Sequence, residues 1–316
     1  MKIKIVPLLF IVLTSCSQSS KPLENKIFCF DTMVNLKLYQ GNEENLNELH
    51  SIFTNISKLT DNYTANDKAS VYTLNHTNEE VTIDEDLYEL LKLSLEMKNQ
   101  GASYYNPLCG SLSKKWKESL KNLQILNENI KNDELLKISS SSLLLKDNNV
   151  VQRLGDAEID LGGIAKGYVL DKTYEYLQTK EIKNYLIDAG SSSILLGEKN
   201  NKDGLFSVGL KEVQNTYLKL KNCFVSSSGI SEQGVTINGV TYSHIVNPIN
   251  GSAINENDAV IVISDKGYYG DAISTSMMMN TVEEIKEIEA AHNIKTIVVK
   301  NKQIIYCHKD IEVYHH

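Results

Sequence analysis

Residues 159–168 read IDLGGIAKGY, and this stretch decides how the chain around it folds. It contains three glycines, Asp160 and Lys166, and a helical pattern of apolar residues follows it as far as Leu177. Glycine lets a backbone approach a ligand closely, and a helix start presents free N–H groups to an anion. The stretch has neither the GxxxxGK[ST] spacing of a Walker loop nor the GxGxxG order of a dinucleotide fold. On these residues alone, a phosphate cradle and an ordinary strand-to-helix turn both remain open.

Around this turn, strand and helix patterns interleave without a repeat, which predicts an α+β (mixed α/β) fold. Asp84 is expected to cap one helix, and Thr281 with Glu284 forms a capping box before another. The polar segment 121–151 is interpreted as a variable excursion. The expected strands are 34–38, 185–187, 206–210, 217–220, 259–263 and 296–299, and the expected helices contain 46–56, 87–94 and 285–288.

The composition excludes several classes of protein. The 316 residues include 32 Lys and Arg against 40 Asp and Glu, which gives a formal net charge of -8. This acidic balance argues against a nucleic-acid binder, because such proteins carry clustered positive charge. A hydrophobic content of 41% is enough for a folded core, so a largely disordered chain is excluded. An internal run of about 18 apolar residues is absent from the sequence, which excludes a polytopic membrane protein.

The first residues predict export. Lys2 and Lys4 precede the apolar stretch 5–13, and the following Leu13-Thr14-Ser15-Cys16 resembles a bacterial lipobox. The alternative is an ordinary cleaved signal with an incidental cysteine. On the lipoprotein interpretation, acyl chains anchor the protein on the outer, extracytoplasmic face of the cytoplasmic membrane. The expected organisation is a signal peptide at 1–15, lipidated Cys16, a tether over 16–29 and a folded domain over 30–316.

Four cysteines remain after Cys16: Cys29, Cys109, Cys223 and Cys307. They form no CxxC pair, which argues against a zinc site. An exported location permits disulfides, and the sequence leaves open whether any form.

Three further clusters carry candidate chemistry. Small residues at 188–193 permit close approach of a backbone, although a flexible surface turn is the simpler explanation of these residues. The serine run 226–228 is followed by His244 in the segment 242–248, where the histidine is either a proton-transfer group or a structural residue.

The third cluster is a pair of oxygen-bearing side chains. Asp271 and Thr275 lie four residues apart and therefore share one face of a helix. With a backbone carbonyl, they make a hard oxygen set suited to Mg²⁺. The alternative is a simple helix cap at Asp271.

In chain order, six short blocks resemble the FAD:protein FMN transferase family, often called ApbE. The resemblance runs from about Phe30 to Met279, and it implies a single compact domain with mixed sheets flanked by helices. An exported lipoprotein is also common in this family. The blocks are DTM at 31–33, IDLGGIAKGY at 159–168, DAG at 188–190, SSG at 227–229, YSHIVNP at 242–248 and DAIST at 271–275.

The resemblance implies a role for each matching position. Asn106-Pro107-Leu108 stands where the family commonly has Asp-Pro-Thr, and Ser191 replaces a usual glycine. His244 and Lys166 are the expected catalytic residues. The implied FAD contacts are Met33, Tyr63, Asn106, Leu108, Asp160, Gly162, Lys166, Ala189, Gly190, Ser191 and His244, and the implied Mg²⁺ ligands are Ala165 through its carbonyl, Asp271 and Thr275.

The implied reaction moves FMN from FAD onto a Thr or Ser hydroxyl of an exported or membrane partner protein and releases AMP. Such phosphoryl transfer depends mainly on positioning and on charge neutralisation by the metal and by Lys166. Two alternatives remain at this stage. One is an Mg²⁺-dependent FAD pyrophosphatase that yields FMN and AMP, and the other is a non-catalytic flavin-binding lipoprotein.

Overall fold

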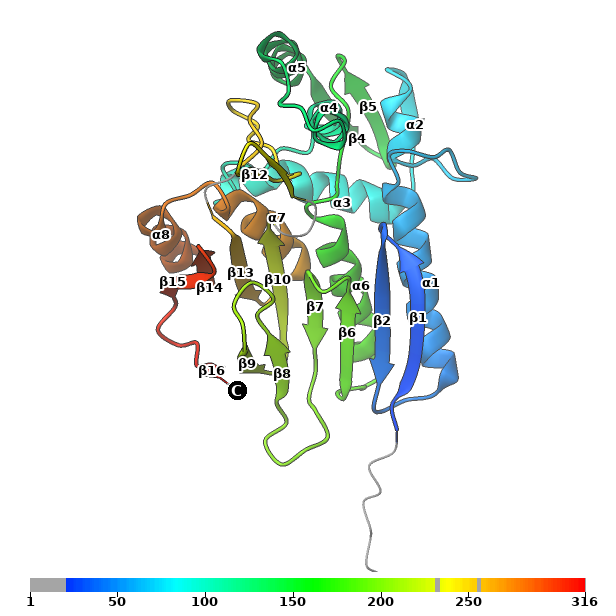
Figure 1. Cartoon of the computed structure of the whole chain (residues 1–316). Coiled ribbons are helices and arrows are strands. Elements are labelled where there is room, and N and C mark those ends of the chain that lie inside the picture. Colours follow the sequence, from blue (N-terminus) through cyan, green and yellow to red (C-terminus); the bar gives the residue numbers. More distant parts are fainter. Residues whose placement is uncertain (1–20, 231–233, 255–256, 316) are drawn as a thin grey trace, which may run out of the picture.

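The computed structural model describes residues 21–230, 234–254 and 257–315. At its centre is an antiparallel sheet in the order β1-β2-β6-β7-β10-β13-β14-β15 (Figure 1). The mixture of this sheet with helices confirms the predicted α+β class. The strands are β1 (Leu23–Cys29), β2 (Thr32–Leu38), β6 (Tyr185–Ala189), β7 (Ser193–Leu196), β10 (Cys223–Gly229), β13 (Ala259–Ser264), β14 (Lys295–Lys300) and β15 (Gln303–Cys307).

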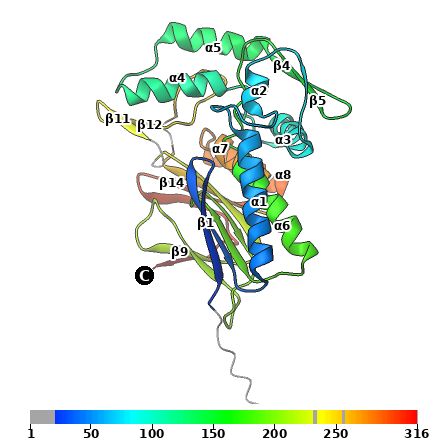
Figure 2. The same ribbon diagram turned by 90° about the vertical axis from the view of Figure 1, so that its right-hand side faces the viewer.

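Each face of the central sheet is covered by a different layer. Helices cover one face, and a small sheet in the order β16-β9-β8 covers the other (Figure 2). The side chains of β10 and β13 divide between the two resulting cores, as the alternation of a strand requires. The covering elements are α1 (Glu43–Thr60), α6 (Ala165–Thr179), α7 (Gly267–Met277), α8 (Val282–His292), β8 (Phe206–Gly209), β9 (Thr216–Leu220) and β16 (Val313–His315).

A second group of elements lies beyond one end of the central sheet (Figure 1). The buried Trp116 ties this group to the segment after β12, because its indole N–H donates to the Gly251 carbonyl at 2.7 Å. The group comprises α2 (Val71–Asn75), β3 (Glu80–Thr82), α3 (Glu85–Glu96), the 3-10 helix η1 (Met97–Gln100), α4 (Gly110–Lys121), α5 (Glu128–Ser140), β4 (Ser142–Lys146), β5 (Val150–Leu154), β11 (Val235–Ile237) and β12 (Val240–Tyr242).

Several sequence predictions meet the structure directly. Strands occupy all six expected ranges, and Asp84 and Thr281 cap α3 and α8. The four cysteines Cys29, Cys109, Cys223 and Cys307 are free. Among the described residues, no helix is long and apolar enough to cross a membrane.

One prediction was wrong in part. The tether predicted over 16–29 is too long, because residues 23–29 form β1 and pair with β2. Ile27 and Cys29 alternate with exposed residues along this edge strand, and only this short pattern marks it. The segment 121–151, interpreted from the sequence as a variable excursion, contains α5, β4 and the start of β5. The signal peptide and Cys16 lie outside the described residues.

Helices α6 and α7 cross at two glycines. A Cβ at Gly167 would lie 2.1 Å from the Gly267 carbonyl oxygen, and a Cβ at Gly267 would lie 2.3 Å from the Gly167 carbonyl oxygen. Neither position has room for a larger residue, because real Cβ atoms never approach so closely. The crossing brings the first turns of both helices together.

Candidate functional site

A cavity of about 540 Å³ lies where the N-terminus of α6 meets α7, β10 and the group of elements beyond the end of the central sheet. Its size is within the range of small-molecule and cofactor sites. Separate parts of the chain form the walls: the turn at Phe30 and Asp31, the loop 60–64, the segment 104–106, residues of α4, the turn 160–166, serines at β7 and β10, the segment 244–246 and residues of α7.

Asp271 forms part of the cavity wall from the middle of α7. Its Oδ2 accepts a 2.6 Å hydrogen bond from the backbone N–H of Gly167, which the glycine crossing makes possible. Its Oδ1 accepts hydrogen bonds from the hydroxyls of Ser193 at 2.8 Å and Ser226 at 2.7 Å. Burial raises the pKa of Asp271, and the charge of Lys166 with these three hydrogen bonds opposes that rise.

The register of the sheet explains why two hydroxyls meet one carboxylate oxygen. Ser193 of β7 and Ser226 of β10 are cross-strand partners, so their side chains lie on the same face of the sheet. Ser228 lies two residues further along β10 and therefore shares that face. Its hydroxyl lies 3.1 Å from the Thr275 Oγ1, which itself donates to the Asp271 carbonyl at 3.0 Å. These residues form a continuous polar floor beneath the cavity.

His244 lies in the cavity wall, which also includes Lys117 and Lys166. Burial, Lys117 and Lys166 together lower its pKa to about 4, so the imidazole is neutral near pH 7. Its Nδ1 atom is buried and has no hydrogen-bond partner among the described residues. A neutral imidazole with a free nitrogen can accept a proton from a ligand hydroxyl.

Tyr63 lies at the more exposed side of the same cavity. The ammonium nitrogens of Lys114 and Lys117 lie 5.0 and 5.8 Å from the centre of its ring, within the range of cation–π contacts. Lys117 also donates to the Tyr63 hydroxyl at 3.3 Å. Burial alone would lower the pKa of Lys117, but Asp160, Tyr63 and Asp31 together raise it. The ring therefore remains available beside a positive patch.

Most of the residues proposed from the sequence meet in this cavity, and some do not. Met33 is 48% exposed and pairs across the hairpin with Phe28, outside the cavity lining. Leu108 is buried in the core, and the Asn106 side chain is occupied by a 2.9 Å hydrogen bond from the Leu108 N–H. The cavity wall includes Tyr63, Asn106, Asp160, Gly162, Ala165, Lys166, His244, Asp271 and Thr275, and it does not include Met33, Leu108, Ala189, Gly190 or Ser191.

The turn 189–191 lies next to the site without lining it. Ala189 ends β6 fully buried, while Gly190 and Ser191 turn the chain with φ of +74° and +62°. The following Ser192 and Ser193 reach the cavity. The sequence therefore indicated the correct turn, but the residues that face the cavity come two positions later.

The sequence analysis assigned no role to Ser193, Ser226, Lys117 and Tyr105, although the two serines lie in clusters that it named. The serines carried a signal, because hydroxyl residues in otherwise apolar strands need partners when buried. Lys117 and Tyr105 carried no comparable signal, because they stand in polar or mixed segments without a spacing rule.

The oxygen ligands that could hold a cation are few. Among the described residues, no group of three or more His, Cys, Asp and Glu side chains converges as a metal site. The Asp271 carboxylate, however, accepts three hydrogen bonds and has about four lone-pair positions, which leaves one for a cation. With the neighbouring Thr275 hydroxyl and the Ala165 carbonyl, the donors are all oxygen, the set that Mg²⁺ prefers.

Comparison with known proteins identifies the family of the chain. The profile of the ApbE family matches residues 30–298. This chain belongs to the ApbE family. A FAD:protein FMN transferase from Klebsiella pneumoniae is 26% identical over 89% of this chain and 92% of that protein. A FAD:protein FMN transferase from Treponema pallidum is 24% identical, and the match covers 62% of this chain and 60% of the length of that relative.

Solved ApbE structures share the fold. The crystal structure of an ApbE protein from Thermotoga maritima has a TM-score of 0.75 at 21% identity, and it covers 93% of this chain and 97% of its own. The flavin transferase ApbE from Vibrio cholerae has a TM-score of 0.72 at 18% identity, with 93% and 97% covered. At these identities the structural likeness establishes the ApbE fold of the chain.

Proposed function

We propose that this protein transfers FMN from FAD to a Thr or Ser hydroxyl of a partner protein and releases AMP. The observation that carries the proposal is the meeting, in one cavity, of a buried carboxylate, a neutral histidine and a lysine at the start of α6. Membership of the ApbE family supports the same activity, because the matched relatives are named FAD:protein FMN transferases.

The carboxylate of Asp271, the hydroxyl of Thr275 and the carbonyl of Ala165 would hold one Mg²⁺. The hard oxygen donors and the remaining lone pair of Asp271 support this assignment. When bound, Mg²⁺ neutralises negative charge that develops on the diphosphate. The positive charge of Lys166, which lines the same cavity, would stabilise the phosphate oxygens from another side.

The protein residues position the two reactants. Asp160, Gly162 and Lys166 would lie along the diphosphate and adenosine, and Tyr63 at the exposed side would face the flavin ring. The oxygen of the acceptor hydroxyl bonds to the FMN-side phosphorus, and the bond from that phosphorus to the AMP oxygen breaks. His244 would accept the hydroxyl proton, because its lowered pKa keeps the imidazole unprotonated and its Nδ1 has no partner among the described residues.

We also propose that the mature protein is a lipoprotein on the outer face of the cytoplasmic membrane. The lipobox-like sequence 13–16 supports this location. Strand β1 begins at Leu23 and leads to the turn at Phe30 and Asp31, which line the cavity. A strand of seven residues spans roughly 20 Å, so an anchor before Leu23 would hold the cavity well away from the membrane.

The activity is tested by mass spectrometry of an acceptor protein incubated with this protein, FAD and Mg²⁺. The expected result is covalent addition of FMN with equimolar release of AMP, and loss of both when the metal is chelated. AMP and free FMN without modified acceptor would indicate a pyrophosphatase, and FAD binding without AMP would indicate a non-catalytic flavin protein.

The role of His244 is tested by single-turnover transfer with His244→Ala. We expect the rate to fall about 10²–10⁴-fold, the usual contribution of a general base. A rate close to that of the wild type would remove His244 from the chemistry.

A further inference from the structure

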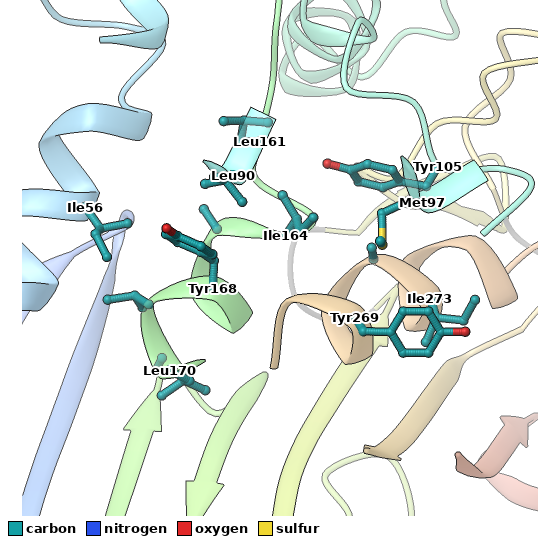
Figure 3. Close-up of a cluster of buried hydrophobic side chains, with 14 of the residues drawn as sticks. Ile56, Leu90, Met97, Tyr105, Leu161, Ile164, Tyr168, Leu170, Tyr269 and Ile273 are labelled. Carbon is teal, nitrogen blue, oxygen red and sulfur yellow. The ribbon is translucent and has the colours of Figure 1, made fainter. Parts of the chain in front are cut away.

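Figure 3 labels three buried tyrosines of one core cluster, Tyr105, Tyr168 and Tyr269, and of these three only Tyr105 lines the cavity. The Tyr168 hydroxyl donates to Glu89 at 2.6 Å, and the Tyr269 hydroxyl donates to the Gln100 carbonyl at 2.8 Å. The Tyr105 hydroxyl is buried and has no hydrogen-bond partner among the described residues. Buried hydroxyls are normally paired, so this exception calls for a partner that the protein itself does not supply.

The ring of Tyr105 is fixed beside the polar floor of the cavity. The side chain is 6% exposed, and its ring lies near Met97, with the hydroxyl directed toward the segment that carries Leu161 and Ile164 (Figure 3). A Cβ built on Gly163 would lie 3.4 Å from both a ring carbon of Tyr105 and the Thr275 Oγ1. Gly163 thus separates the phenol from Thr275 by the width of about one atom.

The surroundings of Tyr105 make it a hydrogen-bond donor. Burial, with the neighbouring Asp160, Cys109 and Asp271, raises its pKa well above the usual range, so the phenol keeps its proton. The nearby carboxylates already have partners, because Asp160 accepts from the Gly162 N–H at 2.8 Å and Asp271 accepts three hydrogen bonds. The Tyr105 hydroxyl donates to neither carboxylate, so it is free to donate to a ligand that enters the cavity.

We infer that the Tyr105 hydroxyl donates a hydrogen bond to a phosphate oxygen of the bound dinucleotide and so holds the diphosphate against the floor of the site. The inference rests on the proposed function, because it specifies a contact within the same cavity. A phosphate oxygen is charged and is therefore among the strongest acceptors for a neutral donor. Tyr105 is a binding residue on this account, and the proton transfer remains with His244.

The test is the substitution Tyr105→Phe, which removes one oxygen and keeps the ring. We expect the affinities for FAD and for ADP to fall about 10- to 100-fold by calorimetry, the effect of losing a hydrogen bond to a charged group. The affinity for riboflavin, which has no phosphate, should stay unchanged. The melting temperature of the ligand-free protein should stay the same or rise, because the variant no longer buries an unpaired hydroxyl.

Tyr269→Phe is the matched control from the same cluster. Its hydroxyl is paired and it does not line the cavity, so the variant should melt at a lower temperature and bind FAD with unchanged affinity. We thus expect Tyr105→Phe to lose affinity for FAD without losing stability, and Tyr269→Phe to lose stability without losing affinity for FAD.

Two results would overturn the inference. One is unchanged affinity of Tyr105→Phe for both FAD and ADP, which would assign the hydroxyl to a buried water. The other is an equal loss for riboflavin, which would indicate a displaced ring. If either result is found and the wild-type protein still transfers FMN, the inference is wrong and the proposed function stands. A wild-type protein that fails to bind FAD defeats the proposed function, and this inference with it.

Discussion

Helices α6 and α7 carry the same short sequence pattern and use it for different purposes. Gly167 and Tyr168 precede Asp171 in α6, and Gly267 and Tyr268 precede Asp271 in α7, each as Gly-Tyr-x-x-Asp. Each aspartate accepts hydrogen bonds from the first turn of the other helix. The two carboxylates therefore hold the crossing from both sides.

The difference between the two aspartates lies in their remaining partners. Both oxygens of Asp171 accept backbone N–H groups of α7, at 2.9 Å from Gly267 and 2.7 Å from Tyr268. Asp271 accepts only one backbone N–H and turns its other oxygen toward two serine hydroxyls at the cavity. The comparison shows that the same pattern gives a structural cap where backbone donors occupy both oxygens and a candidate ligand where they do not.

Among the tests of the comparison between the two helices, the largest expected effect comes from Asp271→Asn. This change keeps the size and one acceptor oxygen but removes the charge, so FMN transfer should fall about 10²–10³-fold in single-turnover assays. Asp171→Asn is the matched control and should transfer FMN at the wild-type rate per folded molecule. An equal loss of FMN transfer in the two variants would contradict the assignment of Asp171 as a structural cap and Asp271 as a candidate ligand.

The crossing itself is tested by Gly167→Ala. Its methyl group would lie 2.1 Å from the Gly267 carbonyl oxygen, so the helices must separate and both aspartates lose contacts. We expect the free energy of unfolding to fall by about 3 kcal/mol in urea titrations. Gly209→Ala is the control, because a Cβ there meets no atom within 4 Å. Similar stability of both variants would show that the crossing can relax.

A smaller effect is expected from Asp171→Asn on stability. One backbone N–H loses its acceptor, so the variant should be less stable by about 1–3 kcal/mol near pH 5. Burial raises the pKa of Asp171 to about 7, so the folded wild type binds a proton more tightly than the unfolded chain. The free energy of unfolding of the wild type therefore decreases as the pH rises from about 4 to about 7. Because the variant lacks this titrating group, the difference in free energy of unfolding between the two proteins should become smaller over this range. A gap that widens over this range would contradict the assignment.

The smallest expected effect is a change in the pH dependence of the reaction, and it concerns His244 in the cavity wall. Because its pKa is lowered to about 4, kcat/KM for FAD should decline on the acid side near pH 4 and not near pH 6.5. Lys117→Met removes one of the charges that lower this pKa and should move the decline to higher pH. Circular dichroism at each pH distinguishes this titration from unfolding. A decline of wild-type kcat/KM near pH 6.5 would contradict the conclusion that burial and the two lysines lower the pKa of His244.

The elements with regular apolar patterns could be predicted, and those held by polar contacts could not. The buried runs of β13 and β14 and the capping box at Thr281 were visible in the sequence. Helix α5 was not, because it buries Lys131 and Glu134. Glu134 is paired with Lys137 at 2.7 Å, a contact between charged residues that an apolar pattern does not mark.

For the candidate site, the sequence located the blocks but not their partners. The glycine-rich turn, His244 and Asp271 stood in recognisable blocks, and all of them meet in the cavity. The donors to Asp271 depend on the pairing of Ser193 with Ser226, which are 33 residues apart and become neighbours only through strand register. Met33 and Leu108 were proposed by position in a block, which does not reveal on which side of the chain a residue points.

The contact between Gly167 and Gly267 also bears on how the gene can change. Every single-base change out of a glycine codon that still encodes an amino acid adds at least one side-chain atom, and neither position has space for one. Neutral drift at these two codons is therefore confined to synonymous bases, and a substitution at one of them cannot be accommodated by a smaller residue at the other.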